Sequence, residues 1–247
     1  LHVYKNEAQL FLDSSGESLH KRGYKVMNHP APINEVVAAA MIKLSGWKAD
    51  CDFIDPMCGG GTILIEAAMQ ALNIPAGFYR RNYGFGYWKN FDAERWREIR
   101  KSAAIKDDVS VDFYGSDINP RFLDMAETNI RKARLEDFIR LEKRDMRQAK
   151  PARIPSLVMM NPPYGERLAV DDLNEFYSEI GDSLKNNFSG CRAFIISSDM
   201  DALKHIGLKA NYKTKLFNGP LECRFMGYDL FKGDHKNYAT HKKNREE

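Results

Sequence analysis

Asn161, Pro162, Pro163 and Tyr164 are the residues of this sequence whose types point most directly to chemistry. They follow the apolar run "SLVMM" at 156–160, which has the composition of a buried strand. Because prolines stop strands, a rigid loop is expected here. The Asn amide oxygen and the carbonyls of Pro162 and Pro163 can accept hydrogen bonds from an exocyclic amino group, and the tyrosine can stack on the ring that carries it. A rigid turn with a packing tyrosine is the alternative, but it explains poorly why an amide ends the strand.

The stretch "DPMCGGGT" at 55–62 has the composition of a tight turn between a strand and a helix. Its glycines let the backbone approach a ligand closely, and the start of the helix offers free N–H groups. A phosphate-binding loop would continue with Lys and Ser or Thr, and a dinucleotide fingerprint would place glycine where Leu64 stands. This spacing disfavours a phosphate-carrying ligand, while Asp55 favours a positively charged one. A tight turn without a ligand remains the alternative.

Two further acidic residues, Asp117 and Asp145, also follow apolar runs. A carboxylate at the end of the second strand of a βαβ unit can bond two ribose hydroxyls, which suits Asp117. Asp117 could instead cap the next helix, although Asn119 before Pro120 is the better cap. Asp145 could accept a hydrogen bond from an adenine amino group or pair with an adjacent arginine, and the sequence leaves both open.

The elements that must position these residues alternate between strands and helices. Apolar runs ending at Asp55, Asp117, Asp145 and Asn161 predict four strands, with helical spacing between them. The run "CRAFIISSD" predicts another strand, and the last two apolar runs predict a hairpin through 219–220. The alternation predicts an α/β fold whose mainly parallel sheet is covered on both faces. Ligands bind at the carboxyl ends of such strands, so the four polar residues should meet at one edge.

Residues 77–96, "GFYRRNYGFGYWKNFDAERW", interleave aromatic and basic side chains. Stacking combined with phosphate contacts suits single-stranded RNA. A loop whose aromatic side chains are mostly buried explains the composition at least as well. The basic stretch "LHKRGYK" at 19–25 leaves the same choice between RNA contact and solvated surface.

Composition narrows the class of protein further. The chain has 247 residues and a formal net charge of +3, which permits a nucleic-acid partner without requiring one. We find no apolar run of the ~20 residues that a membrane span needs, and the first residues do not resemble a signal peptide. The four cysteines form no CxxC pair, so we expect no metal site. We expect a reducing, cytoplasmic compartment, and disulfide pairing of the four cysteines is the alternative.

Taken in order, "DPMCGGGTILIEAA", "SDIN", "RDM" and "NPPYGERL" resemble the motifs of class I S-adenosylmethionine-dependent methyltransferases. More narrowly, they are similar to the THUMP-associated RNA methylases that modify guanine N2. The stretches "LDSSGESLHKRGYK", "APINEVVAAAMIKLSGW" and "NGPLECRF" also resemble that family, so the similarity runs from about Leu10 to Phe231. Within the family, "NPPYGERL" is most similar to members acting on 23S ribosomal RNA, whereas transfer-RNA enzymes tend to have Asp in place of Asn161.

The resemblance implies a Rossmann-like class I methyltransferase fold, with a mostly parallel seven-stranded sheet and a C-terminal antiparallel hairpin. It implies S-adenosylmethionine as cofactor, RNA as partner, and neither metal nor membrane. The residues implied to grip the target base are Asn161, Pro162, Pro163 and Tyr164. The residues implied to bind the cofactor are Asp55, Pro56, Cys58, Gly59, Gly61, Thr62, Asp117, Ile118, Asp145, Met146 and Asn161.

Members of this family carry a THUMP RNA-binding domain before the matched region. The resemblance therefore implies three parts in this chain. Residues 1–28 form a strand and linker that would connect to an upstream RNA-binding domain, 29–232 form the methyltransferase domain, and 233–247 form a polar, basic tail.

The predicted reaction is methyl transfer from S-adenosylmethionine to guanine N2 in 23S ribosomal RNA. Guanine N2 in transfer RNA and adenine N6 in nucleic acids use the same chemistry and are the alternatives. A nicotinamide-dependent oxidoreductase is a rival of another class, and the broken glycine fingerprint disfavours it. A catalytically silent RNA-binding module is disfavoured by the intact set of acidic strand ends and Asn161.

Overall fold

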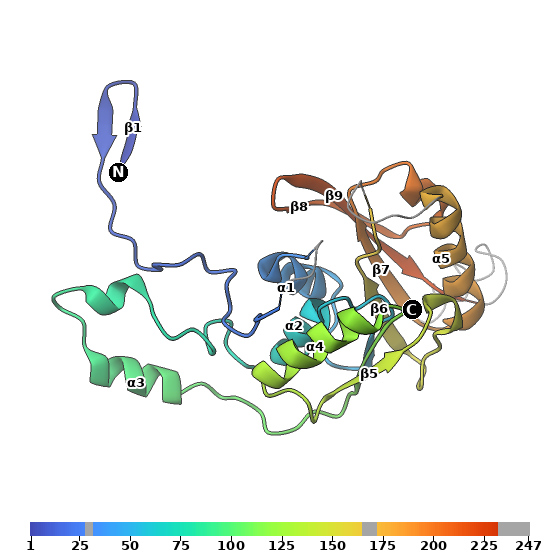
Figure 1. Cartoon of the computed structure of the whole chain (residues 1–247), viewed down its shortest axis with the longest axis horizontal. Coiled ribbons are helices and arrows are strands. Elements are labelled where there is room, and N and C mark those ends of the chain that lie inside the picture. Colours follow the sequence, from blue (N-terminus) through green and yellow to red (C-terminus); the bar gives the residue numbers. More distant parts are fainter. Residues whose placement is uncertain (28–31, 165–171, 232–247) are drawn as a thin grey trace, which may run out of the picture.

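The computed structural model describes residues 1–27, 32–164 and 172–231, and a seven-stranded sheet lies at its centre (Figure 1). The strands follow the order β5-β4-β3-β6-β7-β9-β8 across this sheet. They are β3 (Asp52–Asp55), β4 (Phe113–Asp117), β5 (Ile139–Lys143), β6 (Ser156–Met160), β7 (Arg192–Ser197), β8 (Tyr212–Asn218) and β9 (Leu221–Asp229). Strands β3 to β7 pair in parallel, and β9 is antiparallel to both of its neighbours. The predicted parallel sheet with a C-terminal hairpin is confirmed.

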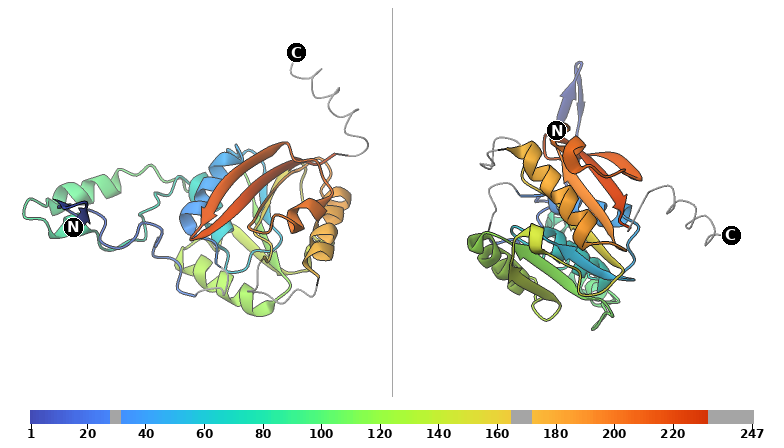
Figure 2. Two further views of the ribbon diagram at one scale, coloured as in Figure 1. Left: turned by 90° about the horizontal axis from the view of Figure 1, so that it is seen from above. Right: turned by 90° about the vertical axis from the view of Figure 1, so that its right-hand side faces the viewer.

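Helices cover both faces of the sheet (Figure 1, Figure 2). The α-helices are α1 (Glu35–Leu44), α2 (Thr62–Ala71), α3 (Ala93–Lys101), α4 (Pro120–Lys132) and α5 (Leu173–Asn187). The 3₁₀ helices are η1 (Gly84–Tyr87), η2 (Met146–Gln148) and η4 (Ala202–Ile206). One apolar cluster packs α1, α2 and α4 on one face, and a second packs α5 and η4 on the other.

Neighbouring residues of a central strand enter opposite clusters, as pleating requires. Phe53 and Leu157 contribute to the α1–α2 side, whereas Ile54 and Val158 contribute to the α5 side. All four are 5% exposed or less. Because both faces are covered, the central strands need apolar side chains on both, which is why they read as continuous apolar runs.

Two helix starts are set by asparagine caps. The sequence predicts both, since Asn34 precedes apolar residues at helical spacing and Asn119 precedes Pro120. The Asn34 side chain accepts a hydrogen bond from the main-chain N–H of Val36 at 2.9 Å. Asn119 accepts one from Arg121 at 3.0 Å, with Pro120 in the first helical turn. The side-chain oxygen of each cap satisfies an N–H that has no partner inside its helix. The cap of α4 is therefore Asn119, the better of the two predicted candidates.

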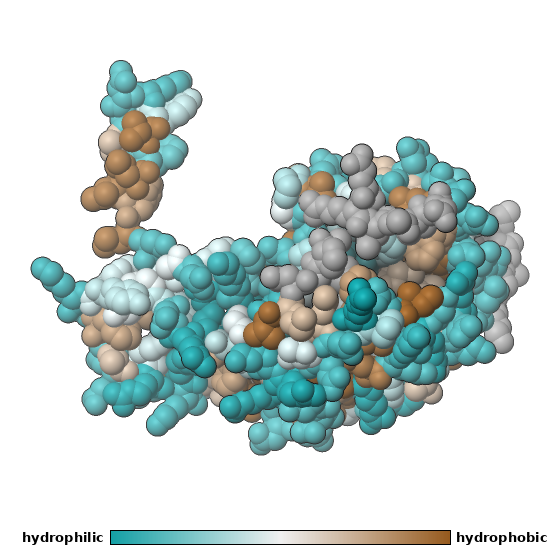
Figure 3. Space-filling view, in the orientation of Figure 1, coloured by the Kyte–Doolittle hydropathy of each residue, from teal (hydrophilic) through white to brown (hydrophobic). Residues whose placement is uncertain are grey.

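The N-terminal segment differs in detail from its prediction. The sequence indicates one strand followed by a turn at Ser14–Gly16. The turn is present, with the Asp13 carboxylate accepting from the N–H groups of Ser15 and Gly16, but the single strand is instead a short hairpin of β1 (His2–Tyr4) and β2 (Glu7–Gln9). The residues between these strands, Lys5 and Asn6, adopt the left-handed conformation of a two-residue hairpin turn. The hairpin projects from the body, as does a lobe of η1 and α3 (Figure 1). Hydrophobic surface is visible along the projecting segment (Figure 3).

Gly181 lies inside α5, where glycine weakens a helix by about 1 kcal/mol relative to alanine. A Cβ atom at this position would overlap the main-chain carbonyl of Ile206, the last residue of η4. We expect Gly181→Ala to separate α5 from η4 and to lower the free energy of unfolding by about 1–3 kcal/mol. Urea unfolding monitored by circular dichroism measures this change.

Gly86→Ala is the matched control, because a Cβ added at Gly86 would meet no atom within 4 Å. Its free energy of unfolding should stay within about 0.5 kcal/mol of the wild type. A stabilised Gly181→Ala protein would show that helix propensity outweighs the packing of η4.

Candidate functional site

Three polar residues end neighbouring strands at one edge of the sheet. Asp55 is the last residue of β3, Asp117 is the last of β4, and Asn161 directly follows β6. Because β3 pairs in parallel with both β4 and β6, these ends lie side by side. All three line a cavity of about 450 Å³. The predicted meeting of polar strand ends at this edge is therefore observed.

The cavity also collects the other residues predicted for the site, with one exception. Its lining includes Pro56, Cys58, Gly59, Thr62, Ile118, Asp145, Met146, Pro162, Pro163 and Tyr164. The exception is Gly61, which precedes α2 with a φ of 78°. A Cβ there would lie 3.3 Å from the Cβ of Ala126 in α4. Gly61 thus allows the turn to pack closely on α4.

The Asp117 carboxylate holds the glycine turn in place. One oxygen accepts a hydrogen bond from the main-chain N–H of Gly59 at 3.0 Å, and the other accepts from Asn119 at 2.9 Å. The side chain therefore ties the end of β4 to the turn that follows β3. The N-cap of α2 makes no side-chain hydrogen bond, which leaves the first N–H groups of that helix available beside the turn.

Asn129 supports the same turn from α4, and sequence reasoning missed it. It is fully buried, and its amide nitrogen donates to the carbonyl of Gly60 at 3.0 Å. Its amide oxygen accepts from the main-chain N–H groups of Val26 and Met27 at 2.9 and 3.2 Å. A polar residue within the apolar spacing of α4 was the available signal.

Asp145 forms the ion pair that the sequence left open. Its carboxylate accepts a hydrogen bond from Nε of Arg147 at 2.9 Å, and Arg147 also contacts Glu179 at 3.2 Å. The Arg147 side chain lowers the pKa of Asp145 below its usual range. Asp145 and Arg147 both line the cavity, so the ion pair forms part of its wall. A contact to an adenine amino group stays a prediction.

Asn161 places an unsatisfied hydrogen-bond acceptor in the cavity. Its Oδ1 atom is buried and has no hydrogen-bond partner among the described residues. A buried polar atom left without a partner costs about 1–3 kcal/mol. This cost is understandable if a ligand donates a hydrogen bond at that point.

The two residues at the end of this motif are held by side chains that the sequence did not indicate. The hydroxyl of Tyr177 in α5 donates to the Pro163 carbonyl at 3.3 Å, and it lies 2.8 Å from Oγ of Ser197. The Pro163 carbonyl thus has a partner inside the protein. Asn218, at the end of β8, donates from Nδ2 to the Tyr164 hydroxyl at 3.1 Å.

Asn218 also reaches the start of α1. Its Oδ1 atom accepts a hydrogen bond from the main-chain N–H of Asn34 at 3.0 Å. One side chain therefore joins the C-terminal hairpin, α1 and the aromatic residue of the Asn-Pro-Pro-Tyr motif. The sequence indicated only a hairpin turn at this position, because Asn before Gly219 and Pro220 is typical of turns.

Asp55 is almost completely buried, which raises the pKa of its carboxyl group to about 8. The largest cause is the loss of water around the charged form. A hydrogen bond from the N–H of Met57 acts in the opposite direction, and the nearby Asp117 carboxylate adds a smaller increase. At neutral pH the buried carboxyl group is therefore mostly protonated until a positive charge approaches it.

Metal ligands do not gather among the described residues, since no group of three or more His, Cys, Asp or Glu side chains there could hold an ion. The four cysteines are all free. No helix in the described part of the chain combines the length and the apolar composition needed to cross a bilayer.

Comparison with known proteins identifies the family to which this site belongs. A model of the RMKL-like methyltransferase domain matches residues 22–226. The chain belongs to the RMKL-like methyltransferase domain family. The membership predicted from the four motifs, and with it the class I methyltransferase fold, is confirmed.

Individual relatives of this methyltransferase domain agree. A Synechocystis protein named as a candidate RNA methyltransferase is 34% identical over 233 residues, which cover 93% of this chain and 61% of that protein. The ribosomal RNA large subunit methyltransferase K/L of Psychromonas ingrahamii is 37% identical over 236 residues, covering 92% and 31%. The structure of SMU.472, a candidate methyltransferase complexed with SAH, has a TM-score of 0.82 at 36% identity and covers 90% and 58%. The chain spans less than two thirds of each of these relatives.

The raised pKa of Asp55 predicts a pH-dependent stability. The pKa of Asp55 is about 8 in the folded protein and 3.8 in the unfolded chain. The neutral carboxyl group therefore adds its full contribution to the free energy of unfolding below pH 3.8, and this contribution is lost as the pH rises through 8. Because an asparagine side chain cannot ionise, Asp55→Asn should gain at least about 2 kcal/mol in free energy of unfolding relative to the wild type between pH 4 and pH 8. Urea unfolding across this range measures the difference.

The exposed Asp107 provides the control substitution, Asp107→Asn, which removes a carboxylate from the surface instead of the cavity. The difference in free energy of unfolding between Asp107→Asn and the wild type should change by less than about 0.5 kcal/mol over the same pH range. If the free energies of unfolding of the wild type and Asp55→Asn differ by the same amount at every pH, the raised pKa of Asp55 is contradicted.

Proposed function

We propose that this domain transfers a methyl group from S-adenosylmethionine to the N2 amino group of a guanine in RNA, with 23S ribosomal RNA as substrate. The observation that carries this proposal is the buried, unpartnered Oδ1 of Asn161 in the cavity that the glycine turn also lines. An acceptor in that position suits an amino group. The names of the large-subunit K/L relatives support the choice of ribosomal RNA.

The residues around the glycine turn fit S-adenosylmethionine. The start of α2 has free N–H groups, and Asp55 offers a buried carboxyl group whose ionisation a cationic methionine moiety would favour. We assign the methionine part to Asp55, Pro56, Cys58, Gly59, Gly61 and Thr62. We assign the ribose to Asp117, and the adenine to Ile118, Asp145 and Met146. Gly61 acts in this assignment by shaping the turn, because it does not line the cavity.

When bound, S-adenosylmethionine supplies an electrophilic methyl group attached to a positively charged sulfur. The guanine amino group is a weak nucleophile, because its lone pair is delocalised into the ring. Asn161 Oδ1 and the Pro162 carbonyl would accept hydrogen bonds from its two N–H groups and favour a more tetrahedral nitrogen. Tyr164 would stack on the base and fix its plane. Alignment of this kind lowers the activation free energy by up to about 7–11 kcal/mol. Positioning by these residues would therefore supply most of the rate enhancement.

The wider organisation of the protein follows from the same proposal. Residues 1–28 would serve as a linker to an upstream RNA-binding domain, 29–232 as the catalytic domain and 233–247 as a basic tail, which lies outside the described residues. Tyr24 and Met27 contact the catalytic body, so the end of the linker would be anchored there. Four free cysteines suit a reducing cytoplasmic compartment, in which ribosomal RNA would be available.

Removing the acceptor at Asn161 tests the proposal. Asn161→Ala should lower kcat for guanine N2 methylation by about 10²–10³-fold, because it removes a preorganised polar contact to the reacting group. The dissociation constant for S-adenosylmethionine should change much less. Nucleoside mass spectrometry of ribosomal RNA after reaction measures N2-methylguanosine, and calorimetry measures cofactor affinity.

Two further variants make this test specific. Asn161→Asp keeps an acceptor and should retain more activity than Asn161→Ala, whereas Asn90→Ala, at an exposed position of the lobe, should match the wild type. Wild-type activity of Asn161→Ala would refute the assignment. A product carrying N6-methyladenosine instead would establish the alternative amino group.

Asn218 is expected to act as a positioning residue through Tyr164. Asn218→Ala and Tyr164→Phe should each raise KM for RNA about 3–10-fold, equivalent to about 0.7–1.4 kcal/mol, with little change in cofactor affinity. Both substitutions remove the Asn218–Tyr164 hydrogen bond, and Asn218→Ala also removes the bond to Asn34. The effect of the double variant on KM should therefore be close to that of Asn218→Ala and smaller than the sum of the two single effects. Steady-state kinetics of the four proteins measure this coupling, and additive effects on KM would show that Asn218 acts independently of the tyrosine.

A further inference from the structure

A second and larger cavity, of about 1220 Å³, adjoins the methyltransferase site. It lies between residues 17–25, residues 78–82 and the C-terminal end of α4. Pro32, Ile33 and Asn218 line both cavities. A ligand in the smaller cavity could therefore continue into the larger one, which we call the basic groove.

Positive charge is concentrated in the basic groove. Nine lysine or arginine side chains and two glutamates line it, whereas the whole chain has 37 basic and 34 acidic residues. The groove thus holds about a quarter of the cations and very few of the anions. A concave surface with this imbalance focuses its electric field outward and attracts anionic partners.

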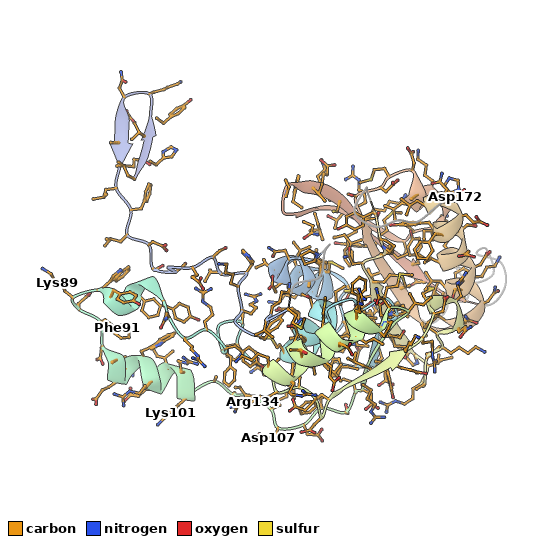
Figure 4. All side chains as sticks on the ribbon, viewed as in Figure 1. Lys89, Phe91, Lys101, Asp107, Arg134 and Asp172 are labelled. Atoms are coloured by element: carbon orange, nitrogen blue, oxygen red, sulfur yellow. The ribbon has the colours of Figure 1, made fainter. Side chains whose placement is uncertain are left out.

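Three of the nine cations are available to a ligand. Four others form ion pairs with glutamates, at nitrogen–oxygen distances of 2.6–3.4 Å. Arg80 and Arg100 donate to main-chain carbonyls. The remaining Arg81, Lys132 and Arg134 form no ion pair with any residue that the structure describes. Arg134 lies where the lobe joins the body (Figure 4).

The wall of the groove is built before any ligand arrives. The buried Arg80 side chain donates to four main-chain carbonyls of residues 15–21, at 2.8–3.1 Å. The Tyr79 hydroxyl donates to the carbonyl of Ala133 at 2.7 Å, which ties the lobe to the end of α4. These bonds hold the free cations on a defined surface, so little ordering is needed on binding.

The aromatic and basic segment at 77–96 separates into two parts. Tyr83, Phe85 and Trp96 pack against one another, with ring centroids 4.9–5.4 Å apart, and do not line the groove. Phe78 lines it with 39% of its surface exposed, three residues before the free Arg81, which also lines the groove. An exposed ring beside free cations can stack on a base while the cations contact phosphates.

We propose that the basic groove binds the phosphate backbone of the single-stranded RNA that flanks the nucleotide held in the smaller cavity. This inference rests on the proposed function and extends it to the surrounding nucleotides. Arg81, Lys132 and Arg134 contact phosphates, and Phe78 stacks on an unpaired base. A single strand fits because its neighbouring bases are unstacked and its backbone can follow the groove out of the site.

The salt dependence of RNA binding tests the groove directly. A fluorescent single-stranded RNA oligonucleotide is titrated with the chain in about 50–200 mM KCl, and anisotropy gives the dissociation constant. Each phosphate contact on a single strand contributes about 0.7 to the slope of log K against log salt. We expect the variant with Arg81→Ala, Lys132→Ala and Arg134→Ala to lose about 2 from this slope and to bind more than about 10-fold more weakly at the lowest salt concentration.

The matched control removes the same charge from three positions that do not line the groove. Lys48 and Lys209 precede β3 and β8, and Lys185 lies in the last turn of α5; all three are exposed. Their triple alanine variant should keep the wild-type slope to within about 0.5. Equal slopes for the two triple variants would overturn the proposal, as would failure of the wild type to bind or tighter binding of a duplex of the same sequence.

A methylation assay separates this inference from the function on which it rests. If the wild type binds with the expected slope but transfers no methyl group to RNA, RNA binding in the groove is supported and the proposed reaction is refuted. If the wild type methylates RNA and the groove variant has an unchanged KM for RNA, the proposed reaction is supported and RNA binding in the groove is refuted. Unchanged S-adenosylmethionine affinity of the variant confirms that its cofactor site is intact.

Discussion

The hydrogen bond from the Gly59 main chain to the Asp117 carboxylate is the interaction on which the candidate site depends. It joins the turn after β3 to the end of β4, and thereby fixes where α2 begins. Asn129 holds the next residue of the turn from α4. Parallel pairing of β3 with β6 then places Asn161 on the other side of the same turn. One carboxylate thus sets the distance between the parts that we assign to the cofactor and to the base.

The site keeps two groups in states that cost stability. Asp55 is buried where its charged form is disfavoured, and Asn161 Oδ1 is buried without a partner among the residues that the structure describes. Neither arrangement is explained by packing, since an apolar residue at either position would avoid the cost. Proteins concentrate such costs where a ligand relieves them. A cation near Asp55 and a hydrogen-bond donor near Asn161 are the two ligand groups that would do so.

Polar side chains connect the smaller cavity with the basic groove beside it. Asn218 holds Tyr164 and lines both cavities, so the smaller site and the basic groove share a wall. Arg80 then fixes residues 15–21 to the lobe, which carries the free Arg81. In the function that we propose, the charge of the groove would attract RNA and the smaller cavity would position the target base.

Much of this architecture was determined by the sequence itself. Local spacing, which acts over a few residues, determines the strand ends at Asp55 and Asp117 and the helix caps at Asn34 and Asn119. The parallel sheet and the methyltransferase family could be predicted from the same short patterns. The tertiary structure alone decided which groups meet across the chain. Asn218 reaches Asn34 over 184 residues and Tyr164 over 54, and the basic groove combines segments that are far apart in the sequence. Such contacts follow from how helices pack on the sheet, and no spacing along the chain records that packing.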